Sequence, residues 1–171
     1  MLATQIRKEA EKMAIEKYWG NYIGGTDDSL TLLDYLVGKQ KDEIPLREIF
    51  ADTGLDKLNW NFRNTEVPLE YKDKEGWEHE FDFAIDLVTD LAALLLECRV
   101  NGKVPFRLIQ NPASDRTIRI TITSEENALM NKALADFTKN PLAYDLHEMV
   151  PDEEMKEMAQ ECENLRQELF E

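Results

Sequence analysis

The chain contains few of the residues that build metal sites and cross-links. Its 171 residues include two cysteines and two histidines. Cys98 and Cys162 both fall on apolar faces of expected helices, where a small buried hydrophobic side chain is the usual role. No Cys or His group has the spacing of a zinc site. We therefore expect no structural disulfide, no zinc and no cofactor.

Long apolar runs are also absent. No stretch of about 18 consecutive apolar residues occurs, so we expect no membrane-spanning helix. The first residues, MLATQIRKEAEKM, are charged rather than signal-like, which argues against secretion and favours a cytoplasmic protein. With 43% apolar residues, the chain can bury a sizeable core. We expect a single α+β domain over residues 1–150, followed by an acidic amphipathic helix over residues 151–171.

Signatures of covalent and phosphate chemistry are missing as well. His79 and His147 are the only histidines, and neither has the spacing of a base beside a nucleophile. Gly24 and Gly25 lack the spacing of a phosphate-binding loop. We therefore expect that the protein is not an enzyme.

Basic residues are scarce relative to acidic ones. The chain has 20 Lys and Arg against 35 Asp and Glu, a net charge of −15. Residues 66–98 carry 2 basic and 10 acidic side chains, net −8, and residues 151–171 carry 2 and 8, net −6. Such charge repels phosphate backbones and anionic lipid and attracts basic surfaces. We therefore expect a basic protein partner, no direct nucleic-acid binding and no membrane binding.

The clearest helix lies within residues 77–98. Its apolar residues recur at the three-and-four spacing of one helical face. They are Ala84, Leu87, Val88, Leu91, Leu94, Leu95 and Cys98. Ile85 and Leu96 lie off this face, so we expect a central helix that is covered on more than one side. Its carboxylates Asp86, Asp90 and Glu97 are expected on the exposed side.

Alternation of period two predicts two β-hairpins around this helix. The first joins residues 67–71 to residues 77–83 through a turn at Asp73–Gly76. The second joins Val104–Gln110 to Thr117–Thr123 through a turn at Asn111–Asp115. The pattern also predicts four flanking helices: over residues 2–19, after Thr26–Ser29, from Thr123 and Glu126 to Asn140, and from Pro151. The second of these is capped within Thr26–Ser29 and stopped by Gly38. Its apolar face is expected to consist of Leu30, Leu33, Leu36 and Val37.

The order of these elements predicts the fold class. Strands that arrive as hairpins, without a βαβ rhythm, favour an antiparallel sheet rather than a parallel one. We therefore expect an α+β fold in which the two hairpins form an antiparallel sheet, packed by the central helix and the flanking helices.

Residues 45–62 resemble the helix-turn-helix motif of transcription regulators. The resemblance rests on Ile49, Phe50, Ala51, Thr53, Gly54 and Leu55, and it implies a second helix that reads DNA. That helix would present Asp56, Lys57, Asn59, Asn61 and Arg63. Its two cations cannot offset the acidity of the chain, so we do not expect DNA binding.

The last helix carries a narrow apolar seam. Met155, Met158, Cys162, Leu165 and Leu169 alternate three and four residues apart, as in a coiled coil. About two heptads are too short to form a stable helix alone in water. The seam must therefore dock on its own domain, which we favour, on a second copy, or on another protein.

These patterns favour a protein that works by binding. We expect an acidic protein-binding module, of the immunity or inhibitor type, that neutralises a basic partner. Its expected contact residues are Glu78, Glu80, Asp82, Asp86, Asp90, Glu97, Met155, Met158, Leu165 and Leu169. One alternative is a non-catalytic structural subunit or adaptor that assembles, for example as a homo-oligomer, through its C-terminal helix. Another is a hydrolase that holds a divalent metal on Asp82, Asp86 and Asp90.

Overall fold

The computed structural model of the protein describes residues 14–109 and 115–171. Most of the helix predicted over residues 2–19 therefore lies outside the described residues. The prediction is wrong at its C-terminal end, because Trp19–Asn21 (β1) pairs in parallel with Ile23–Gly24 (β2). Gly20 within β1 has a φ of 119°, a conformation that glycine adopts readily and that no helix contains.

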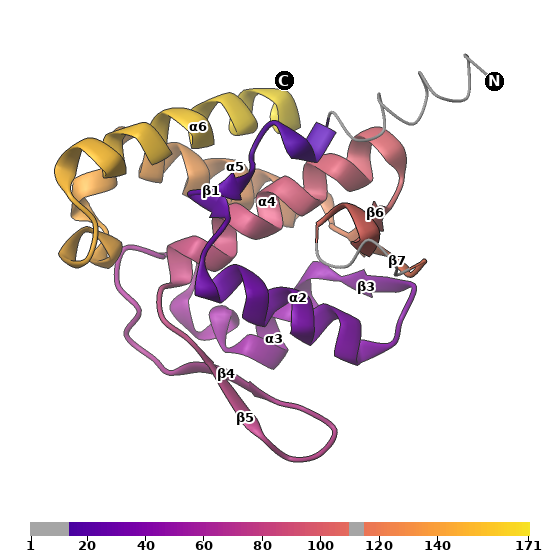
Figure 1. Ribbon diagram of the computed structural model, residues 1–171. Helices are drawn as coiled ribbons and strands as arrows, with labels where there is room; N and C mark the ends of the chain where they lie inside the picture. Colours follow the sequence, from indigo (N-terminus) through magenta and orange to yellow (C-terminus); the bar gives the residue numbers. More distant parts are fainter. Residues whose placement is uncertain (1–13, 110–114) are drawn as a thin grey trace.

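Five α-helices make up the body of the described fold (Figure 1). They are α2 (Asp27–Lys39), α3 (Leu46–Thr53), α4 (Ala84–Asn101), α5 (Ser124–Lys139) and α6 (Asp152–Phe170). Short 3-10 helices lie at η1 (Leu55–Leu58), η2 (Phe106–Leu108), η3 (Pro141–Ala143) and η4 (Asp145–Glu148).

Helix α4 is the central element, as predicted. Figure 1 shows α2 and α3 on one side of it and α5 and α6 on the other. Helices α2 and α6 and strands β2 and β7 all pack against it, and every residue over 84–97 is buried. Ile85 and Leu96 are among these residues, which confirms that the helix is covered on more than one side.

The strands form small separate sheets. They are β3 (Glu43–Pro45), β4 (Leu69–Lys72), β5 (Glu78–Phe81), β6 (Val104–Pro105) and β7 (Thr117–Thr121). Strands β4 and β5 pair antiparallel, while β7 lies between β6, antiparallel, and β3, parallel. The α+β class is confirmed. The two predicted hairpins do not share one antiparallel sheet, because β6 is only two residues long and β7 takes β3 as its second neighbour.

Two helix starts follow the predicted capping patterns. The Thr26 hydroxyl accepts the N–H of Ser29, and the Thr123 hydroxyl accepts the N–H of Glu126. In each pair the second side chain accepts the N–H of the first residue in return. Both are capping boxes, which satisfy donors that a helix start otherwise leaves unpaired.

The end and the buried face of α2 differ from the prediction. Gly38 does not stop the helix, which continues to Lys39 and ends where Gln40 takes a φ of 54°. Leu30 is 59% exposed, whereas Leu32 is fully buried. The helix buries Leu32, Leu33 and Leu36 in the core. Its buried face is therefore rotated relative to the predicted one.

Helix α6 docks on its own domain, as predicted. It packs against α4 and α5, and all five residues of its apolar seam are buried in the common core. Among the residues described, no helix has the length and apolar character needed to cross a membrane. Cys98 and Cys162 are free thiols, and burial raises the pKa of Cys98 to about 11.

Candidate protein-binding surface

The β4–β5 hairpin projects from the bottom of the molecule in Figure 1 and is closed by a turn that Asp73 organises. One carboxylate oxygen of Asp73 accepts the N–H groups of Glu75, at 3.0 Å, and Trp77, at 2.9 Å. The other oxygen lies 2.7 Å from Nε2 of His79, and this contact lowers the pKa of Asp73. Gly76 takes the positive φ, 89°, that the turn requires. The turn therefore fixes the start of β5.

The two faces of this hairpin have different chemistry. The register pairs Leu69 with Phe81 and Tyr71 with His79, and these side chains share the inner face. Leu69 and Phe81 are buried, and the Tyr71 ring stacks on His79 with 4.8 Å between ring centroids. The outer face carries the cross-strand pairs Glu70 with Glu80 and Lys72 with Glu78. The inner face therefore anchors the hairpin, and the outer face is acidic.

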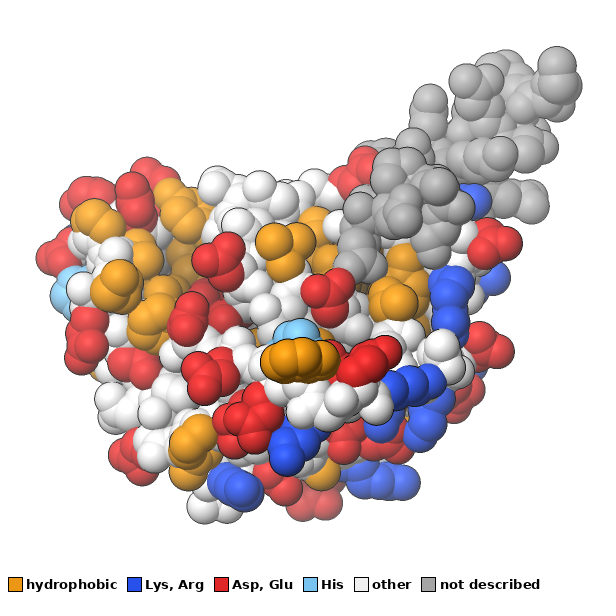
Figure 2. Space-filling view, turned by 60° about the horizontal axis from the view of Figure 1, so that its bottom comes forward, with side chains coloured by type: hydrophobic (Ala, Val, Ile, Leu, Met, Phe, Trp, Pro, Cys, Tyr) orange, Lys and Arg blue, Asp and Glu red, His pale blue; other side chains and the backbone are white. Residues whose placement is uncertain are grey.

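We call the exposed residues Glu70, Trp77, Glu78, Glu80 and Asp82 the hairpin surface. Glu70 and Glu80 lie directly opposite each other, an arrangement of like charges that destabilises a strand pair. Trp77, beside the turn, is 71% exposed. Figure 2 shows carboxylates spread over much of this side of the molecule, with Lys and Arg gathered toward its lower right.

The carboxylates of α4 do not lie on an exposed face, contrary to the prediction. Asp86 is 4% exposed, and Asp90 and Glu97 are fully buried. They are enclosed because elements pack on the helix from several sides, so the polar positions as well as the apolar ones are covered. These three residues are therefore not available to a partner in this structure.

The buried acids join α4 to the segments around α2. Asp90 accepts the N–H of Gly24 at 2.7 Å and the hydroxyl of Ser29 at 2.6 Å. Asp28, in the first turn of α2, accepts the N–H groups of Asp82, at 2.8 Å, and Phe83, at 3.0 Å. A carboxylate at this place satisfies donors at the start of α4 and complements the helix dipole.

Burial changes the proton affinity of this group of acids. It raises the pKa of Asp86 to about 8, with the neighbouring charges of Asp28 and Asp90 adding to the effect. It also raises the pKa of Asp90 to about 7, although hydrogen bonds from Ser29 and Gly24 act in the opposite direction. Asp86 therefore holds a proton near neutral pH, which keeps the buried charge low.

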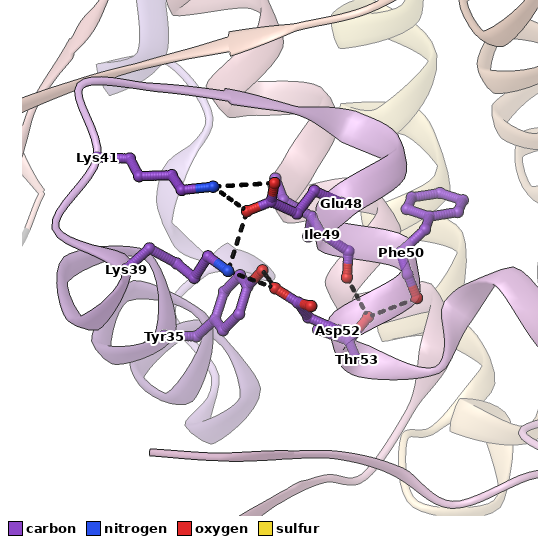
Figure 3. Close-up of polar contacts among 8 residues, drawn as sticks. All are labelled: Tyr35, Lys39, Lys41, Glu48, Ile49, Phe50, Asp52 and Thr53. Atoms are coloured by element: carbon purple, nitrogen blue, oxygen red, sulfur yellow. Dashed lines mark hydrogen bonds and ion pairs between the residues drawn. The ribbon is translucent and has the colours of Figure 1, made fainter. Parts of the chain in front are cut away.

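A second polar network fixes α2 to α3 (Figure 3). The Tyr35 hydroxyl donates to Asp52 at 2.5 Å, and Nζ of Lys39 lies 2.9 Å from oxygens of both Asp52 and Glu48. Lys41 pairs with Glu48 at 2.8 Å. The hydrogen bond from Lys41, and then that from Lys39, lowers the pKa of Glu48. These lysines are therefore engaged with acids of α3 rather than with the hairpin surface.

A cavity of about 400 Å³ lies beside this network. Side chains of α2, α3 and the hairpin line it, among them Tyr35, Asp52, Tyr71 and Lys72. Its cations and carboxylates are mixed, so we assign the cavity no ligand.

The comparison with known families decides the class of the protein. A family model described as Immunity protein 68 matches residues 14–169. The chain belongs to the Immunity protein 68 family. No curated protein and no solved structure matches it. Membership in an immunity-protein family implies a toxin as the binding partner, which agrees with the expectation of a protein-binding module of the immunity type.

The C-terminal helix of this Immunity protein 68 family member does not offer the predicted contact residues to a partner. Met155, Met158, Leu165 and Leu169 are all buried against α4 and α5. The adaptor alternative required this seam to be free, and the chain's own core occupies it. The contact residues that remain from the prediction are Glu78, Glu80 and Asp82, which are exposed. Their binding role stays a prediction.

The helix-turn-helix resemblance does not extend to the structure of this Immunity protein 68 family member. Helix α3 and the turn at Gly54 form, but the next segment is the four-residue 3-10 helix η1. Asn59 and Trp60 then take φ values of 53° and 64°, which no helix continues. The Trp60 ring packs 4.9 Å from the Phe50 ring, so aromatic packing directs this segment into the core.

The residues that the structure describes give no support to the metal-hydrolase alternative. Within residues 14–109 and 115–171, no group of three or more His, Cys, Asp or Glu side chains is arranged to hold a metal ion. Asp82 is exposed, whereas Asp86 and Asp90 are buried, and Asp90 accepts the N–H of Gly24 and the hydroxyl of Ser29. The exposure of Trp77, the first residue of the predicted strand over residues 77–83, was not predicted from the sequence. The available signal was its position next to Gly76, at the end of a charged turn.

Proposed function

We propose that this member of the Immunity protein 68 family neutralises a toxin by binding a basic area of it through the hairpin surface. It would act in the cytoplasm, and by occupying the toxin rather than by chemistry of its own. The observation that carries the proposal is Trp77, 71% exposed on the hairpin beside Glu78. An exposed tryptophan offers apolar area that a partner can bury, and the carboxylates next to it attract basic side chains.

The energetics of protein interfaces support this assignment. Tryptophan is enriched among the few residues that dominate binding energy, because its ring removes a large area from water. Glu70 and Glu80 repel each other in the free protein. A Lys or Arg from a partner placed between them would replace that repulsion with attraction. The net charge of −15 would also speed the encounter with a basic protein.

The test is affinity capture from a lysate of the source organism on the immobilised chain, at about 50 mM and at about 1 M NaCl. We expect capture of a basic protein that is retained at low salt and released at high salt. Trp77→Ala, and separately Glu70→Gln with Glu80→Gln, should reduce its retention. The matched control is Glu125→Gln with Glu148→Gln, which removes two exposed charges outside the hairpin.

Two results would contradict the proposal. One is retention of the captured protein that is the same at low and high NaCl concentration. The other is a loss of retention in the control pair as large as that in the hairpin variants. Circular dichroism of each variant separates loss of binding from loss of fold.

A further inference from the structure

The molecule has a second feature with the size of a binding site. A groove of about 810 Å³ runs between the C-terminal half of α5, η3 and α6. Small residues line it, among them Ala135, Ala143 and Ala159, and Pro141 and Leu142 border it. Its volume lies within the range of ligand-binding clefts, which is roughly 300 to 1,000 Å³.

The charge of this groove is opposite to that of the protein. Lys139, Lys156 and Arg166 line it, and Glu163 is its one acid. The Arg166 guanidinium donates two hydrogen bonds to Glu163, at 2.8 Å and 2.7 Å, so these two charges compensate each other. Lys139 and Lys156 therefore leave the lining of the groove with a net charge of +2, in a chain whose net charge is −15.

The two remaining lysines are available to a ligand. The ion pair of Lys156 is a contact of 3.9 Å with Glu153, which is 87% exposed, and such a pair contributes little. Lys139 is exposed and forms no ion pair with any residue of the described chain. Both ammonium groups are exposed N–H donors, and anionic oxygens are the acceptors that match their charge.

The dimensions of the groove match an extended peptide. Lys156 and Arg166 are ten positions apart on α6, so the wall between them is about 15 Å long. A strand-like segment of about five residues covers that length. Alanine side chains in the groove leave room for the backbone and for one small apolar side chain of such a segment.

We propose that the groove between α5, η3 and α6 binds a short, extended, acidic peptide segment of another protein, with its carboxylates on Lys139 and Lys156. This site is separate from the hairpin surface and opposite to it in charge. It gives the protein a second contact, of different chemistry, beside the one proposed for the toxin.

The test uses a defined probe, a fluorescein-labelled peptide of sequence Glu-Ala-Glu-Leu-Glu-Ala, followed by fluorescence anisotropy. A peptide with lysine in place of each glutamate is the charge control. We expect saturable binding of the acidic peptide, weakened about tenfold or more by Lys139→Glu with Lys156→Glu. Ala143→Leu, which fills the groove without changing its charge, should also weaken binding.

Lys57→Glu with Lys103→Glu is the matched control, because both lysines are exposed and lie outside the groove. This pair should change the affinity less than about twofold. Absence of saturable binding up to about 1 mM peptide would overturn the proposal. So would an equal loss of binding in the control pair. Neither result bears on the hairpin surface, which the lysate capture tests separately.

Discussion

Asp86→Asn should change how the stability of the protein depends on pH. Asp86 is buried next to Asp28 and Asp90, and one of its oxygens has no hydrogen-bond partner. Asparagine has nearly the same shape, stays neutral at every pH and can still donate a hydrogen bond toward Asp28. The substitution therefore removes the titrating carboxyl group of Asp86 with little change in packing.

The sign follows from the direction of the pKa shift. The pKa of Asp86 is about 8 in the folded protein against an ordinary value of 3.8. Between these two values the folded chain binds a proton that the unfolded chain does not. The stabilisation linked to this proton is complete below pH 3.8 and is lost as the pH rises through about 8.

The magnitude follows from the same linkage. One proton bound only by the folded state changes the unfolding free energy by at most about 1.4 kcal/mol per pH unit. Between pH 6 and pH 8 the wild type should therefore lose about 2 kcal/mol through Asp86. The Asp86→Asn variant should lose correspondingly less and be the more stable protein at pH 8.

The assay is urea unfolding at pH 6, 7 and 8, followed by circular dichroism. Asp56→Asn is the control, because Asp56 is exposed on η1. That variant should keep the wild-type pH dependence. If Asp86→Asn shows the same decline between pH 6 and pH 8 as the wild type, Asp86 is not the group that takes up the proton.

Three further predictions concern the fold. Leu91→Asp places a charge where Leu91 is fully buried, so it should destabilise by more than about 4 kcal/mol or prevent folding, as urea unfolding would show. Gln40→Gly should raise stability by less than about 1 kcal/mol in the same assay, because glycine adopts the φ of 54° at the end of α2 without strain but loses the hydrogen bond from Lys74 and gains freedom in the unfolded chain. The hydrogen bond from Arg63 lowers the pKa of Asp136 to about 2, which makes the folded state gain stability above pH 3.8 and lose it as the pH falls toward 2. Arg63→Gln should reduce the loss of stability between pH 3.8 and pH 2, as acid titrations followed by NMR or circular dichroism would show.

Helix faces, helix caps and turns, which depend on residues close together in the chain, were mostly predicted from the sequence. The apolar spacing of α4, the N-cap within Thr26–Ser29, the capping box at Thr123 and the glycine of the hairpin turn each act within a few residues. Such signals can be read along the chain without knowledge of distant partners.

The acids of α4 show what local patterns cannot control. Periodicity assigns polar positions to solvent, yet Asp90 is buried because Gly24 and Ser29 reach it from another part of the chain. In the same way, the N–H groups before α4 are capped by Asp28 of α2 rather than by a neighbour in sequence. The parallel pairing of β3 with β7 is also long-range, and three residues are too few to show alternation.

The candidate site was only partly predictable for the same reason. Glu78, Glu80 and Asp82 are exposed because they lie on a hairpin, whose pattern is local. The seam residues of α6, such as Met155 and Leu165, have a pattern that fits a partner as well as a core. Only the packing of α6 on α4 and α5 distinguishes the two.

Hydrogen–deuterium exchange of the chain, with and without the captured toxin, tests the central claim most directly. If the hairpin surface binds the toxin, exchange should slow over residues 69–82, which include β4, the turn and β5. Protection that appears elsewhere on the molecule, with residues 69–82 exchanging as in the free protein, would contradict the claim.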